Sequence, residues 1–260
     1  MLDAEIPALS RSSVTRQVLG MQQLAPNGVS EHWLLGTCGD IHWHLVADAL
    51  GQDSLNFRAA DGRPLYAAFR ATRLEQARTG PLLGEDLRIH SGIAAAGLSQ
   101  IGSQHILRRH GRKIGTLLML STFVTHDETG SNRRIVRARP ARPCRLPEAG
   151  PELIALERRA RDISRRFRTR RMPLDRAKRI EPSYTLDFNA VGLLYFPSFS
   201  RIAESTAATR RPIRRREMIY MGNVDPGEAV HVRRSGAEVL IARTDGRIIA
   251  ISVEDRLRAA

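Results

Sequence analysis

The same succession of helix-like segment, glycine turn and strand occurs in both halves of the chain, and it limits the possible folds more than any other feature. In the first half, Gly–Glu at 84–85 opens the stretch DLRIHSGI, and Gly–Arg at 111–112 precedes the last strand-like run. In the second half, Gly–Glu at 227–228 opens AVHVRRSG, and Gly–Arg at 246–247 precedes the last run. The repeat predicts an internal duplication whose two units pair about a pseudo-twofold axis, like a homodimer fused into one chain.

The first helix-compatible segment has the sequence GVSEHWLLGTCGDIHWHLVADALG. Ser30 is suited to cap a first turn, and Asp40 is suited to cap a longer helix over 41–50. Gly36 and Gly39 are expected to separate the two pieces. Strand-like runs surround this segment at 13–19, 65–74, 85–99, 104–109 and 114–124.

The second half repeats this order around a helix predicted over 193–208. Its strands are predicted at 218–224, 229–234, 239–244 and 248–253. Helices followed by antiparallel strands indicate an α+β fold. The predicted organisation is a flexible N-terminus (1–12), a first unit (13–126), an Arg/Pro-rich linker with a charged helix over 151–171 (127–182), and a second unit (183–260).

The chain is strongly basic, with a formal net charge of +14 over 260 residues. Arginine and lysine concentrate in 158–179 and 210–216, which indicates an anionic partner or a solvated surface. The anionic candidates are nucleic acid, the phosphates of coenzyme A and the acidic face of an acyl carrier protein. The sequence has neither zinc-finger spacing nor an aromatic-rich RNA-binding strand, which argues against nucleic acid.

No apolar run reaches the roughly 18 residues of a membrane span, and the N-terminus lacks the features of a signal peptide. Cys38 and Cys144 are far apart in sequence and form neither a metal-type spacing nor a disulfide framework. His42 and His44, two apart on a helix, point to different sides and do not form a metal pair. We therefore expect a cytoplasmic, reduced protein without a metal site.

The stretch DFNAVGLLYFPSFS at 187–200 is the strongest candidate for chemistry. Asn189 and Gly192 lie where a strand would give way to a helix, whose first N–H groups lack intrahelical partners. Such groups stabilise negative charge developing on a thioester oxygen, and Asn189 could orient the thioester carbonyl or a departing carboxylate. The alternative is a buried helix start in which Asn189 is a turn residue and Gly192 permits close packing.

Four segments resemble the LnmK-like family of bifunctional acyltransferase/decarboxylases from polyketide biosynthesis. They are GVSEHWLLGTCGDIHW near the N-terminus, GRPLYAAFRATRL at 62–74, DFNAVGLLYFPSF at 187–199 and IYMGNVDPGE at 219–228. The resemblance spans nearly the whole chain. It implies a double hot-dog fold, in which two antiparallel sheets each wrap a central helix.

The resemblance also implies an activity. Such proteins decarboxylate methylmalonyl-coenzyme A and deliver propionyl to an acyl carrier protein, with neither a metal nor a redox cofactor; the coenzyme A thioester is the substrate. The tyrosine that would carry the acyl group corresponds to Tyr66. Asn189 is the second expected catalytic residue, and the expected substrate-binding residues are His32, Trp33, Gly192 and Tyr195.

A tyrosine hydroxyl with its ordinary pKa of about 10 is a poor nucleophile without help from a cation or donor. Strand alternation places Arg70 on the same face as Tyr66, and Arg63 and Arg73 on the other face. The alternative role of Tyr66 is packing within the sheet.

Two other classes of function remain open: a different hot-dog enzyme and a non-catalytic binding protein. A hot-dog thioesterase would need a carboxylate such as Asp187 or Glu204 to activate water, and a dehydratase would need a pair such as His32 and Asp187. A non-catalytic protein would use its basic stretches on nucleic acid, with binding that falls steeply with salt. Cys38 has no base at a suitable spacing and is expected to be a core residue.

Overall fold

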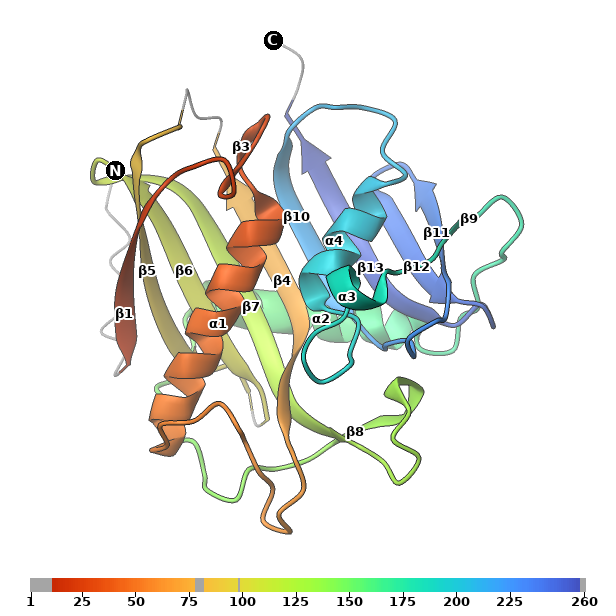
Figure 1. Ribbon diagram of the computed structural model, residues 1–260, viewed down its shortest axis with the longest axis horizontal. Helices are drawn as coiled ribbons and strands as arrows, with labels where there is room; N and C mark the ends of the chain where they lie inside the picture. The colour runs from red at the N-terminus through yellow and green to blue at the C-terminus, as the bar shows by residue number, and fades with distance from the viewer. Residues whose placement is uncertain (1–10, 78–81, 98, 258–260) are drawn as a thin grey trace.

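One large antiparallel sheet dominates the computed structural model, which describes residues 11–77, 82–97 and 99–257 (Figure 1). The predicted flexible N-terminus lies outside these ranges except for Arg11 and Ser12, and Ser12 already begins a strand. Within the described residues the sheet has 11 strands. They are β1 (Ser12–Val18), β4 (Tyr66–Gln76), β5 (Asp86–Ala95), β6 (Ile101–Arg109), β7 (Arg112–His126), β8 (Ile135–Arg137), β9 (Lys178–Ile180), β10 (Ile213–Tyr220), β11 (Val230–Ser235), β12 (Glu238–Arg243) and β13 (Ile248–Arg256). A separate hairpin joins β2 (Leu24–Ala25) to β3 (Gly28–Val29).

The strand order recurs in the two halves, as the repeat in the sequence predicts. The first half has the order β1–β5–β6–β7–β4, and the second half has the order β9–β11–β12–β13–β10. The sheet is continuous, in place of the two sheets expected, because β4 and β10 pair antiparallel from Arg215↔Glu75 to Ile219↔Ala71. The two halves therefore share one sheet through this central pair.

The glycine turns that define the repeat share an unusual backbone conformation. Gly84 and Gly227 have φ of 81° and 87°, and Gly111 and Gly246 have φ of 76° and 78°. Side chains other than glycine rarely adopt this left-handed region. The recurring glycines are thus fixed by equivalent turns before β5 and β11, and before β7 and β13.

Helix α1 (Glu31–Leu50) is a single helix, so the expectation that Gly36 and Gly39 divide it is wrong. Ser30 caps its start and accepts a hydrogen bond from the backbone N–H of Trp33 at 3.4 Å. Asp40 lies inside the helix and caps nothing. Gly39 serves packing and does not end the helix. A Cβ atom at residue 39 would lie 2.9 Å from Cζ of Phe196, so glycine allows a neighbouring element to approach closely.

That neighbour is helix α4 (Phe196–Glu204), which lies beside α1 on the same face of the sheet (Figure 1). It begins three residues later than the sequence predicts, because 188–195 forms a loop that follows the short helix α3 (Tyr184–Asp187). One core cluster contains Leu35, Phe69, Phe199 and Ile241, which come from both halves. The halves thus share a hydrophobic core as well as a sheet.

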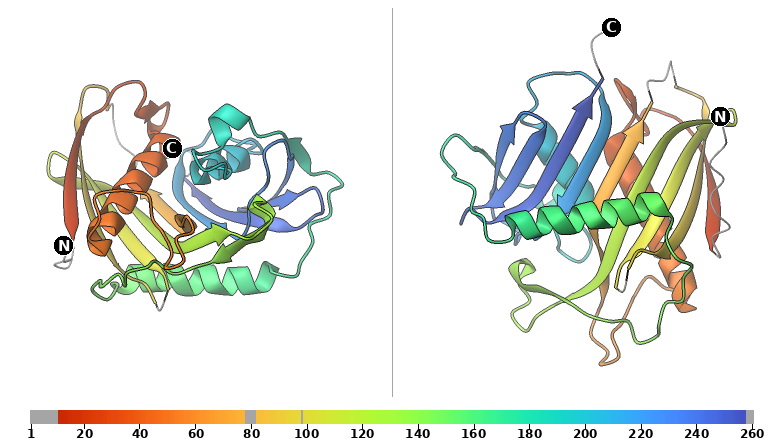
Figure 2. Two further views of the ribbon diagram at one scale, coloured as in Figure 1. Left: turned by 60° about the horizontal axis from the view of Figure 1, so that its bottom comes forward. Right: turned by 180° about the vertical axis from the view of Figure 1, so that it is seen from behind.

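Helix α2 (Pro151–Phe167) crosses the opposite face of the sheet and spans both halves (Figure 2). Its apolar side packs on strands from both sides of the centre, through Leu153, Leu156 and Ala160 against Ala71, Leu118, Leu120 and Ile219. The charged helix expected within 127–182 is present, but this region is more than a linker. It also supplies β8, β9 and the 3-10 turn η1 (Asn132–Arg134).

Strand β4 contains a bulge at Arg70. Phe69 pairs with Ser121 and Ala71 with Leu120, so Arg70 is the extra residue. The bulge reverses the alternation beyond it, and the expectation that Arg73 faces away from Arg70 is therefore wrong. Arg73 binds Glu217 at 3.0 Å, and Glu217 also binds Arg159 of α2, which places Arg73 on the α2 face.

Candidate functional site

A cavity of about 990 Å³ lies where β4 and β10 separate. The two strands pair only between residues 71–75 and 215–219. Beyond that stretch, residues 66–70 of β4 diverge from residues 220–223, which begin with the last residue of β10, and both segments line the cavity. The loop that precedes α4 supplies a third wall, at Phe188–Val191 and Leu193–Phe196. The predicted residues Tyr66, Asn189 and Tyr195 all line this one cavity.

The two sides of the cavity differ chemically. On the side of α1 and α4 the wall is apolar, with Trp43, Phe57, Leu65, Phe69 and Phe196. On the side of α2 the wall contains Arg70, Arg137 and Arg168, which we call the arginine cluster, together with Ser164. The cavity therefore joins an apolar interior to a basic opening.

The arginine cluster carries positive charge that no carboxylate of the described residues balances directly: none of its three members has an ion-pair partner there. Arg70 donates to Ser164 Oγ at 3.5 Å. Partial burial lowers the pKa of Arg70, and the nearby charge of Arg137 lowers it further. Cations held close together without direct ion-pair partners are suited to bind an anion, and guanidinium groups match phosphate geometry.

Tyr66 is half-buried at the edge of the arginine-lined side. Its ring packs edge-on against His126, with ring centroids 5.5 Å apart. His126 Nε2 lies 2.8 Å from Oδ1 of the buried Asn132. Asn132 in turn donates from Nδ2 to the carbonyl oxygens of Gly192 (2.7 Å) and Val224 (2.8 Å). This chain of contacts joins the Tyr66 wall to the second half of the molecule.

The loop around Gly192 uses its own amides. Asn189 Oδ1 accepts from the N–H groups of Val191 (3.2 Å) and Leu193 (3.0 Å), and Gly192 N–H donates to the carbonyl oxygen of Asn189 at 2.9 Å. The amides near Gly192, predicted to hold a substrate oxygen, are therefore already paired, and Gly192 (φ 76°) serves the turn. Asn189 Nδ2 has no acceptor among the described residues and remains available to a ligand in the cavity.

Tyr195 is a further donor in the wall. Its hydroxyl oxygen would lie 3.7 Å from a Cβ atom at Gly36, so the side chain reaches α1. Burial, and then the charge of Asp40, raise the pKa of Tyr195 to about 12. The hydroxyl is consequently protonated at neutral pH and can donate a hydrogen bond to a substrate.

His32 and Trp33 do not reach the cavity. His32 is exposed in the first turn of α1 and lines a second, smaller pocket, whereas Trp33 packs against the core. The residue of α1 that does line the cavity is Trp43, which the sequence reading missed. Its Nε1 donates to the Ala67 carbonyl at 2.9 Å, and its ring stacks on Phe69 at 5.9 Å. About three helical turns separate Trp43 from the predicted pair, and only the packing of α1 shows which aromatic residue faces the cavity.

The carboxylates considered for water activation have other partners. Asp187 is buried and binds Arg201 at 3.0 and 2.7 Å, and it also accepts from Ser183 N–H. Glu204 binds Arg216 and Arg256. Neither lines the cavity, and the part of the wall that the structure describes contains no Asp, Glu, His or Cys. Cys38 is fully buried, and burial raises the pKa of its thiol, as expected of a core cysteine.

Among residues 11–77, 82–97 and 99–257, none of the helices combines the length and the hydrophobicity that crossing a membrane requires. Within the same ranges, no group of three His, Cys, Asp or Glu side chains could hold a metal ion.

Solved structures of acyl-thioester enzymes share this architecture. An acyl-ACP thioesterase from Bacteroides thetaiotaomicron is similar with a TM-score of 0.65 and 13% identity, over 95% of this chain and 98% of that one. The 12:0-ACP thioesterase from Umbellularia californica is similar with a TM-score of 0.64 and 11% identity, over 94% and 96%. No protein-family model matches the sequence, and the search of curated proteins found no match. At these identities the likeness establishes the fold, a large antiparallel sheet with few helices that fits the hot-dog class.

Proposed function

We propose that this protein is an enzyme acting on acyl thioesters of coenzyme A or of an acyl carrier protein. The observation that carries the proposal is the two-sided cavity, which joins an apolar interior to the arginine cluster. A phosphopantetheine thioester has the same two-sided chemistry, with phosphate at one end and an acyl chain at the other. The volume of about 990 Å³ lies at the upper end of the usual range for ligand pockets, roughly 300–1,000 Å³.

The proposed binding mode follows from the chemistry of the wall. The phosphate lies on Arg70, Arg137 and Arg168, and the acyl chain enters the apolar side. The thioester carbonyl then lies between them, where β4 and β10 separate. Tyr66 and Asn189 line this part of the cavity and can donate hydrogen bonds to the carbonyl oxygen. Donors fixed around an oxygen that gains negative charge lower the barrier of acyl transfer.

Hydrolysis of the thioester is the first candidate reaction, because the two solved structures with a similar fold described above are named as thioesterases. Water adds to the carbonyl carbon, the carbon–sulfur bond breaks, and the thiol leaves with a proton from that water. Neither Asp187 nor Glu204 lines the cavity, so the water would be oriented by neutral groups such as Tyr66 and Asn189.

Decarboxylation with acyl transfer is the second candidate, as the LnmK-like resemblance implies. The specific observation that favours it is a described wall without a carboxylate or histidine, in which Tyr66 lies near unpaired arginines. In this reaction the thioester passes its acyl group to the Tyr66 oxygen, and the hydroxyl proton leaves with the thiolate. Loss of carbon dioxide from a (methyl)malonyl group leaves an enolate, whose oxygen accepts a hydrogen bond from Asn189 Nδ2 and whose carbon then takes a proton from water. A carrier-protein thiol finally takes the acyl group and returns its proton to the Tyr66 oxygen.

A panel of thioesters tests both candidates. The purified protein is incubated with malonyl-, methylmalonyl-, acetyl- and decanoyl-coenzyme A, with and without a phosphopantetheinylated carrier protein, and products and intact protein are weighed by mass spectrometry. Free acid and coenzyme A indicate hydrolysis; propionyl on the carrier protein, or an acyl adduct on the enzyme, indicates the second reaction. No turnover of any thioester, together with nucleic acid that co-purifies and dissociates in salt, would overturn the proposal in favour of the nucleic-acid alternative.

The carrier protein is the proposed macromolecular partner, and α2 is its proposed docking surface. Arg165 and Arg166 are exposed at the end of α2 next to Arg168 of the cavity wall. The other basic run, 210–216, lies at the opposite end of the β4–β10 pair, around the second pocket. Charge reversal at 165 and 166 should therefore weaken transfer to a carrier protein more than the same change at Arg214, and equal effects would count against α2.

A further inference from the structure

The two hydrogen-bond donors of the proposed reaction come from different halves of the chain, and a third segment contacts the surroundings of both. Tyr66 begins β4, whereas Asn189 lies in the loop that precedes α4. The third segment is η1, which follows β7 of the first half and extends beneath the second half (Figure 1). It contributes Asn132 to the wall of the cavity.

The turn η1 is fixed to the second half by bonds that do not involve the side chain of Asn132. Asp225 accepts from the backbone N–H of Asn132 and from Ser131 Oγ, both at 2.7 Å. Arg133 forms an ion pair with Glu228. A change confined to the side chain of Asn132 therefore leaves these anchors in place.

The orientation of the Asn132 amide follows from its partners. Its nitrogen atom lies 2.7 Å from the carbonyl oxygen of Gly192 and 2.8 Å from that of Val224, and carbonyl oxygens only accept. The NH₂ group must therefore face these two oxygens, and Oδ1 must face His126 Nε2 at 2.8 Å. Because Oδ1 cannot donate, Nε2 of His126 carries a hydrogen.

Each of these bonds fixes a group next to a proposed donor. The ring of His126 packs edge-on against Tyr66, so the direction of the imidazole limits where the tyrosine ring can lie. The Gly192 N–H donates to the Asn189 carbonyl at 2.9 Å, while the Gly192 carbonyl is held by Asn132. The side chain of Asn132 thus acts on both sides of the cavity wall.

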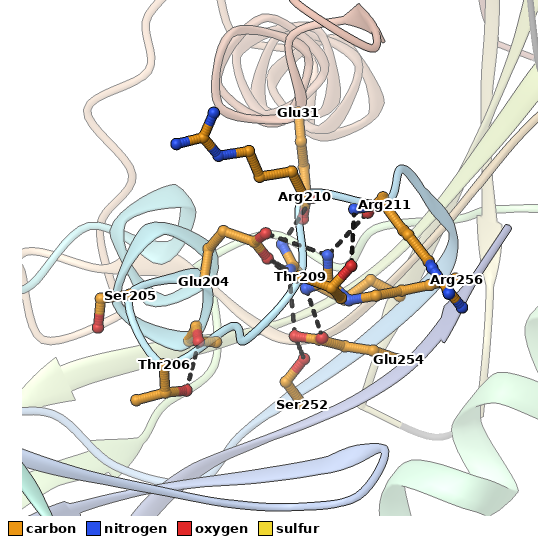
Figure 3. A network of polar contacts seen from close by, with 12 residues as sticks. Glu31, Glu204, Ser205, Thr206, Thr209, Arg210, Arg211, Ser252, Glu254 and Arg256 are labelled. Atoms are coloured by element: carbon orange, nitrogen blue, oxygen red, sulfur yellow. Dashed lines mark hydrogen bonds and ion pairs between the residues drawn. The ribbon is translucent and has the colours of Figure 1, made fainter. Parts of the chain in front are cut away.

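The rest of the loop and α4 have anchors of their own. Asn223 binds both the N–H (2.9 Å) and the carbonyl oxygen (3.1 Å) of Leu194. At the end of α4, Glu204 belongs to a network of ion pairs at the second pocket (Figure 3). Three guanidinium groups meet three carboxylates there, so the charges balance: Arg216, Arg234 and Arg256 bind Glu31, Glu204 and Glu254. Asn132 therefore acts on the turn at 189–192 and not on α4.

We propose that Asn132 is a positioning residue, which holds the Tyr66 hydroxyl and the Asn189 Nδ2 group in fixed relation around the thioester carbonyl. The inference rests on the proposed function, and it does not require Asn132 to contact the substrate. A displacement of about 1 Å at a reacting group can lower the rate by roughly 10²-fold.

Kinetics with any thioester that the wild-type protein turns over test the proposal. Asn132→Ala should lower kcat by roughly 10–100-fold, and KM should stay near the wild-type value because the arginine cluster is unchanged. Ser131→Ala is the matched control, because it removes a hydrogen bond of the same turn at a residue that does not line the cavity. It should keep both wild-type constants, with circular dichroism showing that each variant is folded.

A second substitution tests the link to Asn189. Asn189→Asp keeps an oxygen for the amides of Val191 and Leu193 but replaces the Nδ2 donor. Where that donor is already lost, Asn132→Ala should lower kcat by a smaller factor than in the wild-type protein. An equal factor in both proteins would overturn the proposal.

Proton NMR of the histidine rings gives a test that needs no turnover. The Nε2 hydrogen of His126, identified by its loss in His126→Phe, should exchange slowly with water in the wild-type protein and rapidly in Asn132→Ala. If no thioester is turned over, the proposed function fails, and this inference with it. If thioesters are turned over, an unchanged kcat in Asn132→Ala, or an Nε2 hydrogen that still exchanges slowly in that variant, would overturn this inference alone.

Discussion

The ring of Phe196 occupies the space beside Gly39 that any larger residue would need. A Cβ atom at residue 39 would lie 2.9 Å from Cζ and 3.1 Å from Cε1 of that ring. Phe196 begins α4, lines the cavity and packs at 4.3 Å between ring centroids on Phe69. The contact thus sets how closely the helices of the two halves approach, and it positions one wall of the cavity.

Replacing Gly39 by alanine should destabilise the protein by about 1–3 kcal/mol, because the buried Phe196 ring must move into a packed core. Gly36→Ala is the matched control on the same helix, since the nearest atom to its Cβ would be Tyr195 Oη at 3.7 Å, an ordinary contact. Alanine there should stabilise the helix by up to about 1 kcal/mol. Urea denaturation followed by circular dichroism measures both; a Gly39→Ala protein as stable as Gly36→Ala would contradict this account of the interface.

Tyr66→Phe should leave the fold intact and impair the reaction, because only the hydroxyl in the cavity wall is lost. If the oxygen carries the acyl group, turnover and the acyl mass adduct should both disappear. If it only donates a hydrogen bond to the carbonyl, kcat should fall by about 10²–10³ with KM nearly unchanged. Tyr184→Phe, at a residue 67% exposed outside the cavity, is the control. Wild-type kinetics for Tyr66→Phe would remove this residue from the mechanism.

Arg70→Gln and Arg168→Gln should each raise KM for coenzyme A thioesters by roughly tenfold, because one charge-assisted contact to phosphate is lost. The same variants should keep the wild-type KM for pantetheine thioesters, which lack the phosphate. Arg158→Gln changes an exposed arginine of α2 that does not line the cavity, and it should alter neither value. Equal losses with both classes of thioester would show that the arginine cluster does not recognise phosphate.

Stability should fall as the pH drops below about 6.5. His42 and His105 are fully buried, and burial lowers the pKa of each to about 3. The unfolded chain binds protons at these residues near pH 6.5 while the folded chain does not, so each contributes a loss of up to about 1.4 kcal/mol per pH unit between 6.5 and 3. Urea midpoints at pH 7.5, 6.0 and 5.0 measure the slope.

The carboxylate of Glu254 also makes stability depend on pH, but in a different pH range. Its pKa is lowered to about 2, where ion pairs with arginines such as Arg234 outweigh burial, so its contribution is lost only below about pH 4.5. His44→Asn, at an exposed residue of α1, should leave the slope between pH 6.5 and 5 unchanged. A flat stability profile over that interval would contradict the buried, uncharged state of His42 and His105.

The buried histidines belong to a hydrogen-bonded series that fixes α1 on the sheet. His42 lies 2.8 Å from both Ser103 Oγ and Ser121 Oγ, and His105 lies 2.9 Å from Ser103 and 2.8 Å from Ser91. Two neutral imidazoles can satisfy this series with one proton per contact. Serine oxygens can also accept from a charged imidazolium, so the pH effect comes from the cost of placing a charge in this buried position.

Local signals in the sequence predict much of the fold. Strands, the charged helix and the glycine turns are found near their predicted places, because apolar periodicity and left-handed glycine act within a few residues. Gly39 was misread because its role is a contact with Phe196, 157 positions away in sequence. The bulge at Arg70 likewise depends on pairing with β7, and no local pattern specifies it.

The sequence predicted some of the residues that line the cavity. It did not show which of several candidate residues on a helix the tertiary structure would place there. Tyr66 and Asn189 reach the same cavity, yet Trp43 replaces His32 and Trp33 as the contribution of α1. The amides near Gly192 were expected to donate to a substrate oxygen. In the structure they donate to oxygen atoms of Asn189 instead. The arginine cluster combines residues from β4, β8 and the end of α2, which only the tertiary structure brings together.

The two halves belong to one chain, so their sequences need not be the same, as those of identical subunits must be. In a symmetric pair, a substitution at one end of the β4–β10 pair would be copied at the other. Here a single chain supplies both ends, and they differ: within the described residues one is large, apolar and edged by arginines without ion-pair partners, and the other is small and lies on balanced ion pairs. Each end can therefore be altered, by mutation or by design, without any change at its counterpart.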